Sequence, residues 1–372
     1  MKSVFQEYYS LSDVELQSLW NTALIVFDTN VLLNFYRYSD RTIQDFLSLL
    51  RNLDERIWIP HQVAYEFHEE RLTVINQQSN VYATSLSSLN LLKDEFSNKN
   101  RNPFLSEGLF NEFSEILTKV TAELHEKSTQ YLLKIQKDEM LETISEIFEG
   151  RVGSPFTVEK NKDIYTQGNS RYAKRIPPGY EDAKKPEEKR FGDLVMWLQI
   201  IEKAKNESRS VIFVTDERKE DWWLLHSGKV IGPRPELRKE FVDSVGQLFY
   251  VYQPFKFLEY ASKHFNTSID TTTITEVKDL QPFIIDQTEV KSDLTISVAL
   301  EKEKDGSNNA NINGLAELLR VNGYDVEVET SADDNYKLFI PVPNIPDLTR
   351  RIKSKFLSQS SLYGLKVKEF NH

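Results

Sequence analysis

ALIVFDTN, residues 23–30, sets five apolar residues in a row before three polar ones. A short apolar run bounded by polar, turn-forming residues is typical of a strand that is buried on both faces of a parallel sheet. The carboxyl end of this strand then delivers Asp28. Apolar residues at nearly helical spacing follow over 42–53, and a short strand at 57–59 ends at Pro60. Strand, helix and strand in this order form a βαβ unit, which predicts an α/β fold.

A long helical insertion follows the second strand. From residue 60 to about 148 the chain has almost no glycine and a single internal proline, Pro103, which divides two long apolar stripes of helical spacing. We therefore expect a helical hairpin inserted at about 68–148. Residues 150–190 are rich in glycine and proline and have few aliphatic side chains, so we expect a long loop there.

The pattern becomes regular again at Asp193. Residues 194–204 have the pattern of a buried helix, and 211–214 are a second short apolar run, typical of another buried strand. Asp216 follows this strand after one residue, so a second strand end presents a carboxylate. A further helix and strand over 241–252 predict that a first domain spans about residues 1–265.

The C-terminal part differs in composition. We expect a polar linker over 266–289 and a small α+β domain over 290–372. The expected elements of this domain are strand 294–300, helix 312–322, strand 324–328, strand 336–341, helix 345–356 and strand 362–367. This order, βαββαβ, is the ferredoxin-like arrangement. We expect the domain to bind substrate, a protein partner or a second copy of the chain, forming a homo-oligomer.

The composition excludes several classes of protein. The 372 residues carry 46 Lys and Arg against 57 Asp and Glu, a net charge of −11, so contact with nucleic acid must be local. The absence of cysteine excludes disulfides, thiolate nucleophiles and cysteine-bound metal sites. No apolar run is long enough to span a bilayer, and residues 1–10 lack the apolar core of a signal peptide. We therefore expect a cytoplasmic protein with no membrane partner.

Four acidic residues occupy positions where an α/β sheet builds its sites: Asp28, Glu66, Asp193 and Asp216. Ligands bind at the carboxyl ends of the strands, so we expect the four carboxylates to converge there. Grouped carboxylates repel unless a cation neutralises them, and oxygen ligands select a hard ion, Mg²⁺ or Mn²⁺. Three of the four also have an ordinary alternative: Asp193 can cap its helix, Asp216 can be a turn residue, and Glu66 can lie on a solvated helix face.

Four segments of the chain resemble one known family. They are LIVFDTNVLL (24–33), IWIPHQVAYEF (57–67), RFGDLVMWLQ (190–199) and VIFVTDERKEDWW (211–223). Together, over roughly residues 15–255, they resemble the PIN-like nuclease family, specifically its larger branch with a long helical insertion. The resemblance implies a three-layer fold around a parallel sheet.

The same resemblance implies roles for individual residues. The four acids named above match the family's catalytic, metal-binding acids. Asn30 matches the polar residue that supports Asp28, and Thr215 matches the hydroxyl residue before the last acid. Asp221, in the same loop, is a further supporting candidate, either as a fifth acid or as a surface acid paired with Arg218.

The family implies metal-dependent hydrolysis of phosphodiester bonds. Divalent ions activate a water molecule and stabilise the oxygens of the reaction, so no Ser, Cys or His nucleophile is required. RNA is the substrate that the resemblance favours, cut as by an endoribonuclease, and single-stranded or structured DNA is the alternative. Nucleases of this kind act as toxins, in RNA processing and in antiviral defence, and the sequence does not choose among these roles.

Basic side chains in the expected loop suggest where substrate binds. Between residues 171 and 190 there are seven Lys and Arg and four Asp and Glu, and 7 − 4 gives a local charge of +3. We expect Arg171, Lys174 and Arg175 to bind phosphates. The alternative is a solvated loop whose charges bind nothing specific.

Other functions fit the sequence less well. A haloacid-dehalogenase-type phosphatase needs a second Asp two positions after Asp28, where this chain has Asn30. No glycine-rich Walker sequence is present, so nucleotide hydrolysis at a P-loop is not supported. The alternative that stays open is a catalytically silent interaction module for nucleic acid or protein.

Overall fold

The structure is a computed structural model that forms two compact units, Met1–Leu280 and Gln281–His372. Each unit is described by itself. The described residues are 1, 4–97, 105–227, 229–265, 267–280, 294–302, 327–330, 335–342 and 365–371.

A parallel sheet of four strands forms the centre of the first unit. Its strands lie in the order β2 (Ile57–Trp58), β1 (Leu24–Phe27), β3 (Val211–Val214) and β6 (Phe249–Tyr252). Every residue of β1 and β3 is buried, which explains their continuous apolar sequences. The chain leaves β1 toward β2 on one side, while β3 lies on the other side. The carboxyl ends of β1 and β3 are therefore the switch point where α/β folds bind ligands.

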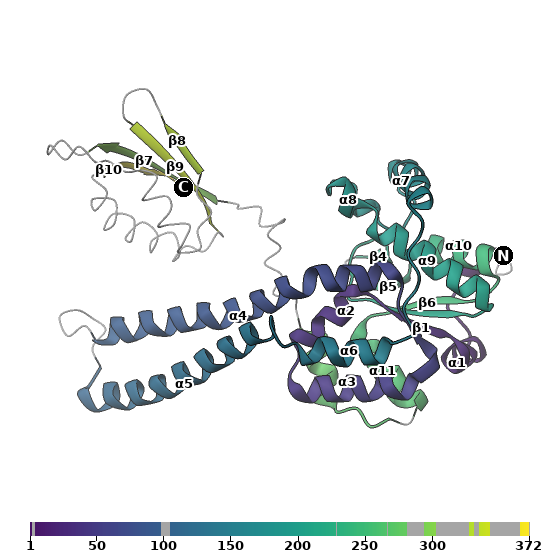
Figure 1. Cartoon of the computed structure of the whole chain (residues 1–372), viewed down its shortest axis with the longest axis horizontal. Helices are drawn as coiled ribbons and strands as arrows, with labels where there is room; N and C mark the ends of the chain where they lie inside the picture. Colours follow the sequence, from purple (N-terminus) through teal and green to yellow (C-terminus); the bar gives the residue numbers. More distant parts are fainter. Residues whose placement is uncertain are drawn as a thin grey trace. The chain divides into compact units, whose positions relative to one another are not determined.

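Helices cover both faces of this sheet (Figure 1). On one face, the ring of Phe27 packs against Phe46 of α3 (Asp40–Leu53) and Phe257 of α11 (Pro254–Phe265). On the other face, Trp197 of α9 (Gly192–Glu207) packs against Phe249 and against Phe241 of α10 (Pro235–Val245). The three-layer α/β prediction is confirmed.

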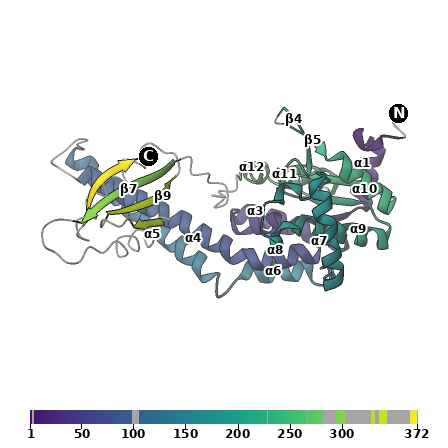
Figure 2. The ribbon, with the colours of Figure 1, turned by 90° about the horizontal axis from the view of Figure 1, so that it is seen from above.

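The predicted helical insertion is a long hairpin of α4 (His61–Ser97) and α5 (Glu107–Leu133). Both views show the two helices side by side, extending away from the sheet (Figures 1 and 2). At 37 residues, α4 is about 55 Å long. Only its first turns lie near the sheet, and α6 (Glu139–Phe148) brings the chain back to the core.

The segment 150–190, which we expected to be a loop, contains α7 (Val158–Ala173), a 3₁₀ turn η4 (Tyr180–Asp182) and the short α8 (Glu187–Arg190). Thr157 caps α7 by accepting a hydrogen bond from the Lys160 amide. The buried face of α7 is formed by Ile164, Gly168 and Tyr172, so it carries a single aliphatic side chain. Gly168 lets the helix approach Phe191, because a Cβ there would lie 2.6 Å from that ring.

Smaller elements complete the first unit. They are η1 (Gln6–Tyr8), α1 (Asp13–Thr22), α2 (Thr29–Leu33), η2 (Asn34–Tyr36), η3 (Asp54–Arg56), the hairpin of β4 (Trp223–His226) and β5 (Lys229–Pro233), and α12 (Thr271–Asp279). The last of these lies in the segment that we expected to be a linker. It packs on α3, where Glu276 accepts hydrogen bonds from Ser39 and Thr42. None of the described helices has the length and apolar character needed to cross a membrane.

The second unit contains an antiparallel sheet in the order β10 (Leu365–Asn371), β7 (Leu294–Lys302), β9 (Asn335–Val342) and β8 (Glu327–Thr330). The first and third strands of this unit along the chain, β7 and β9, are neighbours at the centre of the sheet. The fourth and second, β10 and β8, lie at its edges. Two split βαβ units give this order, which agrees with the predicted ferredoxin-like arrangement. The expected helices 312–322 and 345–356 lie outside the described residues.

Candidate active site

Asp28 is held at the carboxyl end of β1 by two hydrogen bonds. Its Oδ1 accepts from the Thr29 amide at 2.8 Å and its Oδ2 accepts from the Thr215 hydroxyl at 2.6 Å. The residue is only 8% exposed. Burial, together with the negative charges of Glu66 and Glu217, raises the pKa of Asp28 to about 7, although the two hydrogen bonds oppose this rise. The fold therefore confines this carboxyl group at an energetic cost.

Glu66 joins Asp28 through Thr29. The Thr29 hydroxyl donates to Glu66 Oε2 at 2.8 Å, while Gln62, one turn earlier on α4, donates to Oε1 at 2.8 Å. The start of α9 fits against the same carboxylate, since a Cβ on Gly192 would lie 2.6 Å from Oε1. Glu66 thus does not lie on a freely solvated helix face.

Asp193 lies in the first turn of α9 and does not cap it. The N-cap position is Phe191, which makes no side-chain capping bond. The Asp193 Oδ2 is shielded from solvent and has no hydrogen-bond partner in the described part of the chain. Burial raises the pKa of Asp193 well above its ordinary value, while the charge of Lys219 opposes this rise. An unpartnered carboxylate oxygen of this kind suits a cation.

Asp216 follows β3 and is oriented by Asn34. The Asn34 amide donates to Asp216 Oδ2 at 3.2 Å, and Arg37 donates to Asn34 Oδ1 at 2.8 Å. Burial raises the pKa of Asp216. Among the described contacts, Asn30 makes no side-chain hydrogen bond to Asp28. Thr29 and Thr215 support Asp28 instead, and Asn34 was not recognised because it sits within an otherwise apolar stretch.

Asp221 is fully buried and is not a surface acid paired with Arg218. Its Oδ2 accepts from the backbone amides of Gly179 and Glu181 at 2.9 and 3.3 Å, while Oδ1 has no partner within the described residues. Asp221 therefore fixes the turn that leads into η4. The two tryptophans after it, Trp222 and Trp223, are buried in the core, and Trp223 begins β4.

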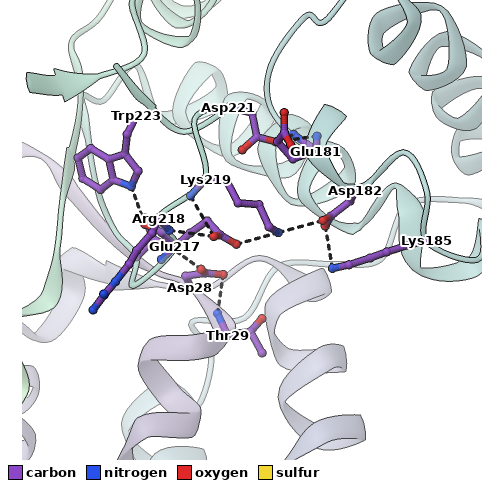
Figure 3. Close-up of polar contacts among 12 residues, drawn as sticks. Asp28, Thr29, Glu181, Asp182, Lys185, Glu217, Arg218, Lys219, Asp221 and Trp223 are labelled. Carbon is purple, nitrogen blue, oxygen red and sulfur yellow. Dashed lines mark hydrogen bonds and ion pairs between the residues drawn. The ribbon is translucent and has the colours of Figure 1, made fainter. Parts of the chain in front are cut away.

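Three charged residues that the sequence did not single out complete this edge of the sheet: Asp182, Glu217 and Lys219 (Figure 3). The Lys219 Nζ lies 2.9 Å from Asp182 Oδ1 and 2.9 Å from Glu217 Oε2. Lys185 pairs with the other oxygen of Asp182 at 2.9 Å. The pair of Lys219 and Asp182 joins residues 37 positions apart, so no local spacing reveals it.

Two of the three predicted phosphate-binding residues are engaged in ion pairs. Arg171 forms a two-pronged pair with Glu240 at 2.6 and 2.8 Å. Arg175 pairs with Glu181 at 3.0 Å and also with Glu220. Lys174 is exposed and makes no ion pair in the described part of the protein. Nearer the acids, Arg218 is exposed and lowers the pKa of Asp216 by its charge, against the larger effect of burial.

The four predicted acids come from α4, α9 and the ends of β1 and β3, and of these Asp28 and Glu66 are joined through the hydrogen bonds of Thr29. Glu217 lies near three of the four, since its negative charge raises the pKa of Asp28, Asp193 and Asp216. Within the described residues, no three acidic or histidine side chains lie close enough together to hold a metal ion. Threonine, glutamine, asparagine and lysine side chains hold the carboxylates in their present positions. The all-oxygen donor set suits a hard divalent ion.

Residues 24–237 match the family described as PIN like domain. The chain belongs to the PIN-like domain family. The match covers strands β1, β2 and β3 of the parallel sheet, the helical insertion and all four acids, while β6 and the second unit lie beyond it. Neither a curated protein nor a solved structure matches the chain. PIN-like domains are usually nucleases and generally use divalent metal ions, so membership supports a phosphodiesterase that binds nucleic acid.

Proposed function

We propose that this protein is an endoribonuclease that hydrolyses phosphodiester bonds with Mg²⁺ or Mn²⁺. The observation that carries the proposal is the buried carboxyl group of Asp28 at the switch point of the sheet, linked by Thr29 to Glu66. Burying like charges together is unfavourable, and proteins keep such arrangements where function needs them. The resemblance noted in the sequence, now joined by family membership, supports nucleic acid as the substrate.

In this proposal Asp28, Glu66, Asp193 and Asp216 hold the ion. When bound, a divalent ion lowers the pKa of water and stabilises the attacking and leaving oxygens. Thr215 and Thr29 orient the two oxygens of Asp28, and Asn34 orients Asp216. The unpartnered Oδ2 of Asp193 supports a role as ligand, because a cation would supply the interaction that this oxygen lacks.

In this proposal, exposed basic side chains bind the phosphates of the substrate. Lys174, which we expected to bind phosphate, keeps that role in the proposal, and Arg218 joins it because it is exposed beside Asp216. Arg171 and Arg175 contribute less, since their guanidinium groups already hold Glu240, Glu181 and Glu220. Changing Arg218 to Ala should then weaken binding and flatten its salt dependence more than changing Arg171.

The test is a cleavage assay on the full chain. Labelled single-stranded RNA and DNA of one sequence are incubated with Mn²⁺, with Mg²⁺ or with EDTA. Asp193→Asn is the test variant, and Asp243→Asn is the matched control, because Asp243 is exposed and pairs with Lys239 one turn away. We expect the wild type and the control variant to cut RNA only when a divalent metal ion is present. DNA as the better substrate would overturn the RNA assignment.

The silent interaction module predicts a different result. A folded wild-type protein that binds nucleic acid but cuts neither RNA nor DNA with any divalent ion would establish that reading and overturn the nuclease proposal. Equal cutting by wild type and Asp193→Asn would also contradict it, because the assigned ligand would then be dispensable.

A further inference from the structure

Lys219 places a positive charge inside the acidic edge of the sheet. It belongs to the loop after β3, and its ammonium lies between the carboxylates of Asp182 and Glu217, 2.9 Å from each (Figure 3). The side chain is 31% exposed, so the pair is partly shielded from water. The pair with Asp182 joins residues that are 37 positions apart in the sequence.

The same charge acts on the neighbouring acids. The charge of Asp193, followed by those of Glu217 and Asp182, raises the pKa of Lys219 against the effect of burial. In turn Lys219 lowers the pKa of Asp193 and of Asp221 against the effect of burial. Lys219 is thus the counter-charge of four acids, two of which have an oxygen without a hydrogen-bond partner among the described residues.

We propose that Lys219 is a resident cation of this site, whose ammonium balances Asp182, Glu217 and Asp193 until a divalent ion binds and the ammonium withdraws. The inference rests on the proposed function and adds a residue that sets the affinity for the ion. Two neighbouring cations repel each other, so the positive charge of Lys219 opposes binding of the divalent ion. A lysine suits this role because its ammonium is a compact charge on a flexible four-carbon stem.

A purely structural role for Lys219 predicts otherwise. In that case the ion pair of Lys219 with Asp182 would hold η4 against the loop after β3. However, Asp221 already fixes this turn through the amides of Gly179 and Glu181. Lys185 also remains on Asp182 when Lys219 leaves, since it binds the other carboxylate oxygen. The turn and the charge of Asp182 therefore both keep support without Lys219.

The experiment measures Mn²⁺ affinity by calorimetry and the melting temperature with and without Mn²⁺, using the full chain. Lys219→Met removes the charge and keeps the apolar stem. Lys185→Met is the control, because it removes the ammonium group that pairs with the other oxygen of Asp182. We expect Lys219→Met to melt lower without metal, to bind Mn²⁺ about tenfold more tightly and to gain more stability from it. Lys185→Met should bind Mn²⁺ as the wild type does. Lys219→Gln repeats the test if the methionine variant does not fold.

The outcomes separate the two proposals. If the wild type binds Mn²⁺ and cuts RNA but the neutral variants of Lys219 bind Mn²⁺ equally or more weakly, the resident cation is overturned and the nuclease stands. If Lys185→Met tightens Mn²⁺ binding as much as Lys219→Met, the effect is general electrostatics and the specific role is overturned. If no variant and no wild-type protein binds Mn²⁺, the proposed function fails and the inference fails with it.

Discussion

The two halves of the acidic edge are held together by different chemistry. Around Asp28 and Glu66 the partners are neutral donors: a backbone amide, two threonine hydroxyls and a glutamine amide. Around Asp182 and Glu217 the partners include two lysine ammonium groups, in addition to the backbone amides of Arg218 and Lys219 that donate to Glu217. Neutral donors orient a carboxylate without cancelling its charge, whereas an ammonium cancels it. The Asp28 half is therefore the part that keeps its negative charge available to a ligand.

The largest effect of breaking this arrangement is expected at Thr215, which is fully buried. Thr215→Val keeps the shape but removes the donor to Asp28 Oδ2 and the acceptor of the Glu217 amide. We expect metal-dependent cleavage to fall about a hundredfold, because Asp28 loses its orientation and its pKa rises further. Initial rates at saturating Mn²⁺ measure this. Thr215→Ser, which retains the hydroxyl, should stay within a few-fold of wild type, and an equal loss in both variants would refute the role of the hydrogen bond.

A second prediction concerns pH and the metal-free protein. The pKa of Asp28 lies near 7 in the folded chain, above its ordinary value of 3.8, so the folded state binds more protons than the unfolded state between these values. The contribution of Asp28 to the free energy of unfolding should therefore be largest below about pH 4 and should fall by a few kcal/mol as pH rises through 7. Urea unfolding in EDTA at several pH values measures this slope.

The matched variants for this prediction are Asp28→Asn and Asp243→Asn. The first should flatten the slope, although part of it remains because burial also raises the pKa of Asp193 and Asp216. The second, an exposed acid outside the site, should leave the slope unchanged. A wild-type slope in Asp28→Asn would show that this carboxyl group does not titrate as described.

A smaller effect is expected where α9 meets Glu66. In Gly192→Ala the added Cβ would lie 2.6 Å from Glu66 Oε1, so the carboxylate must shift. We expect cleavage to fall about tenfold, since displacing a ligand by a fraction of an ångström weakens but does not remove its contribution. Gly108→Ala is the control, because it also lies in the first turn of a helix but has open space around it. Equal activity in both variants would argue against a working role for Glu66.

The positions of the acids at the strand ends could be predicted from the sequence, whereas the contact of Asp182 with Lys219 could not. Asp28 and Asp216 were predictable because each follows a short run of buried apolar residues, and the strand ends of an α/β sheet meet at one edge. Asp182 and Lys219 were not, because their contact joins two loops that only the folded chain brings together. Helix α7 was missed for a related reason: its buried face uses Ile164, Gly168 and Tyr172, and only the fit against Phe191 makes that face apolar.

The smallest effect is expected from the second unit. The family match ends at residue 237, and the acids all lie in the first unit. A chain that ends at residue 280 should cut a short oligonucleotide within about twofold of the full-length rate, as expected if the second unit serves binding rather than chemistry. Its affinity for longer RNA or its oligomeric state should change. Loss of cutting by a truncated chain that is still folded would place part of the active site in residues 281–372.

The central claim is that the Asp28 half binds a divalent ion, and Mn²⁺ binding to wild type and Asp28→Asn tests it most directly. Asparagine keeps the size and most hydrogen bonds of Asp28 but removes the charge. We predict that Mn²⁺ raises the melting temperature of the wild type by several degrees at 100 times its dissociation constant, about 2.7 kcal/mol of stabilisation. Asp28→Asn should melt higher than wild type without metal, since repulsion is relieved, and should gain little from Mn²⁺. Equal stabilisation of the two proteins by Mn²⁺ would contradict the account.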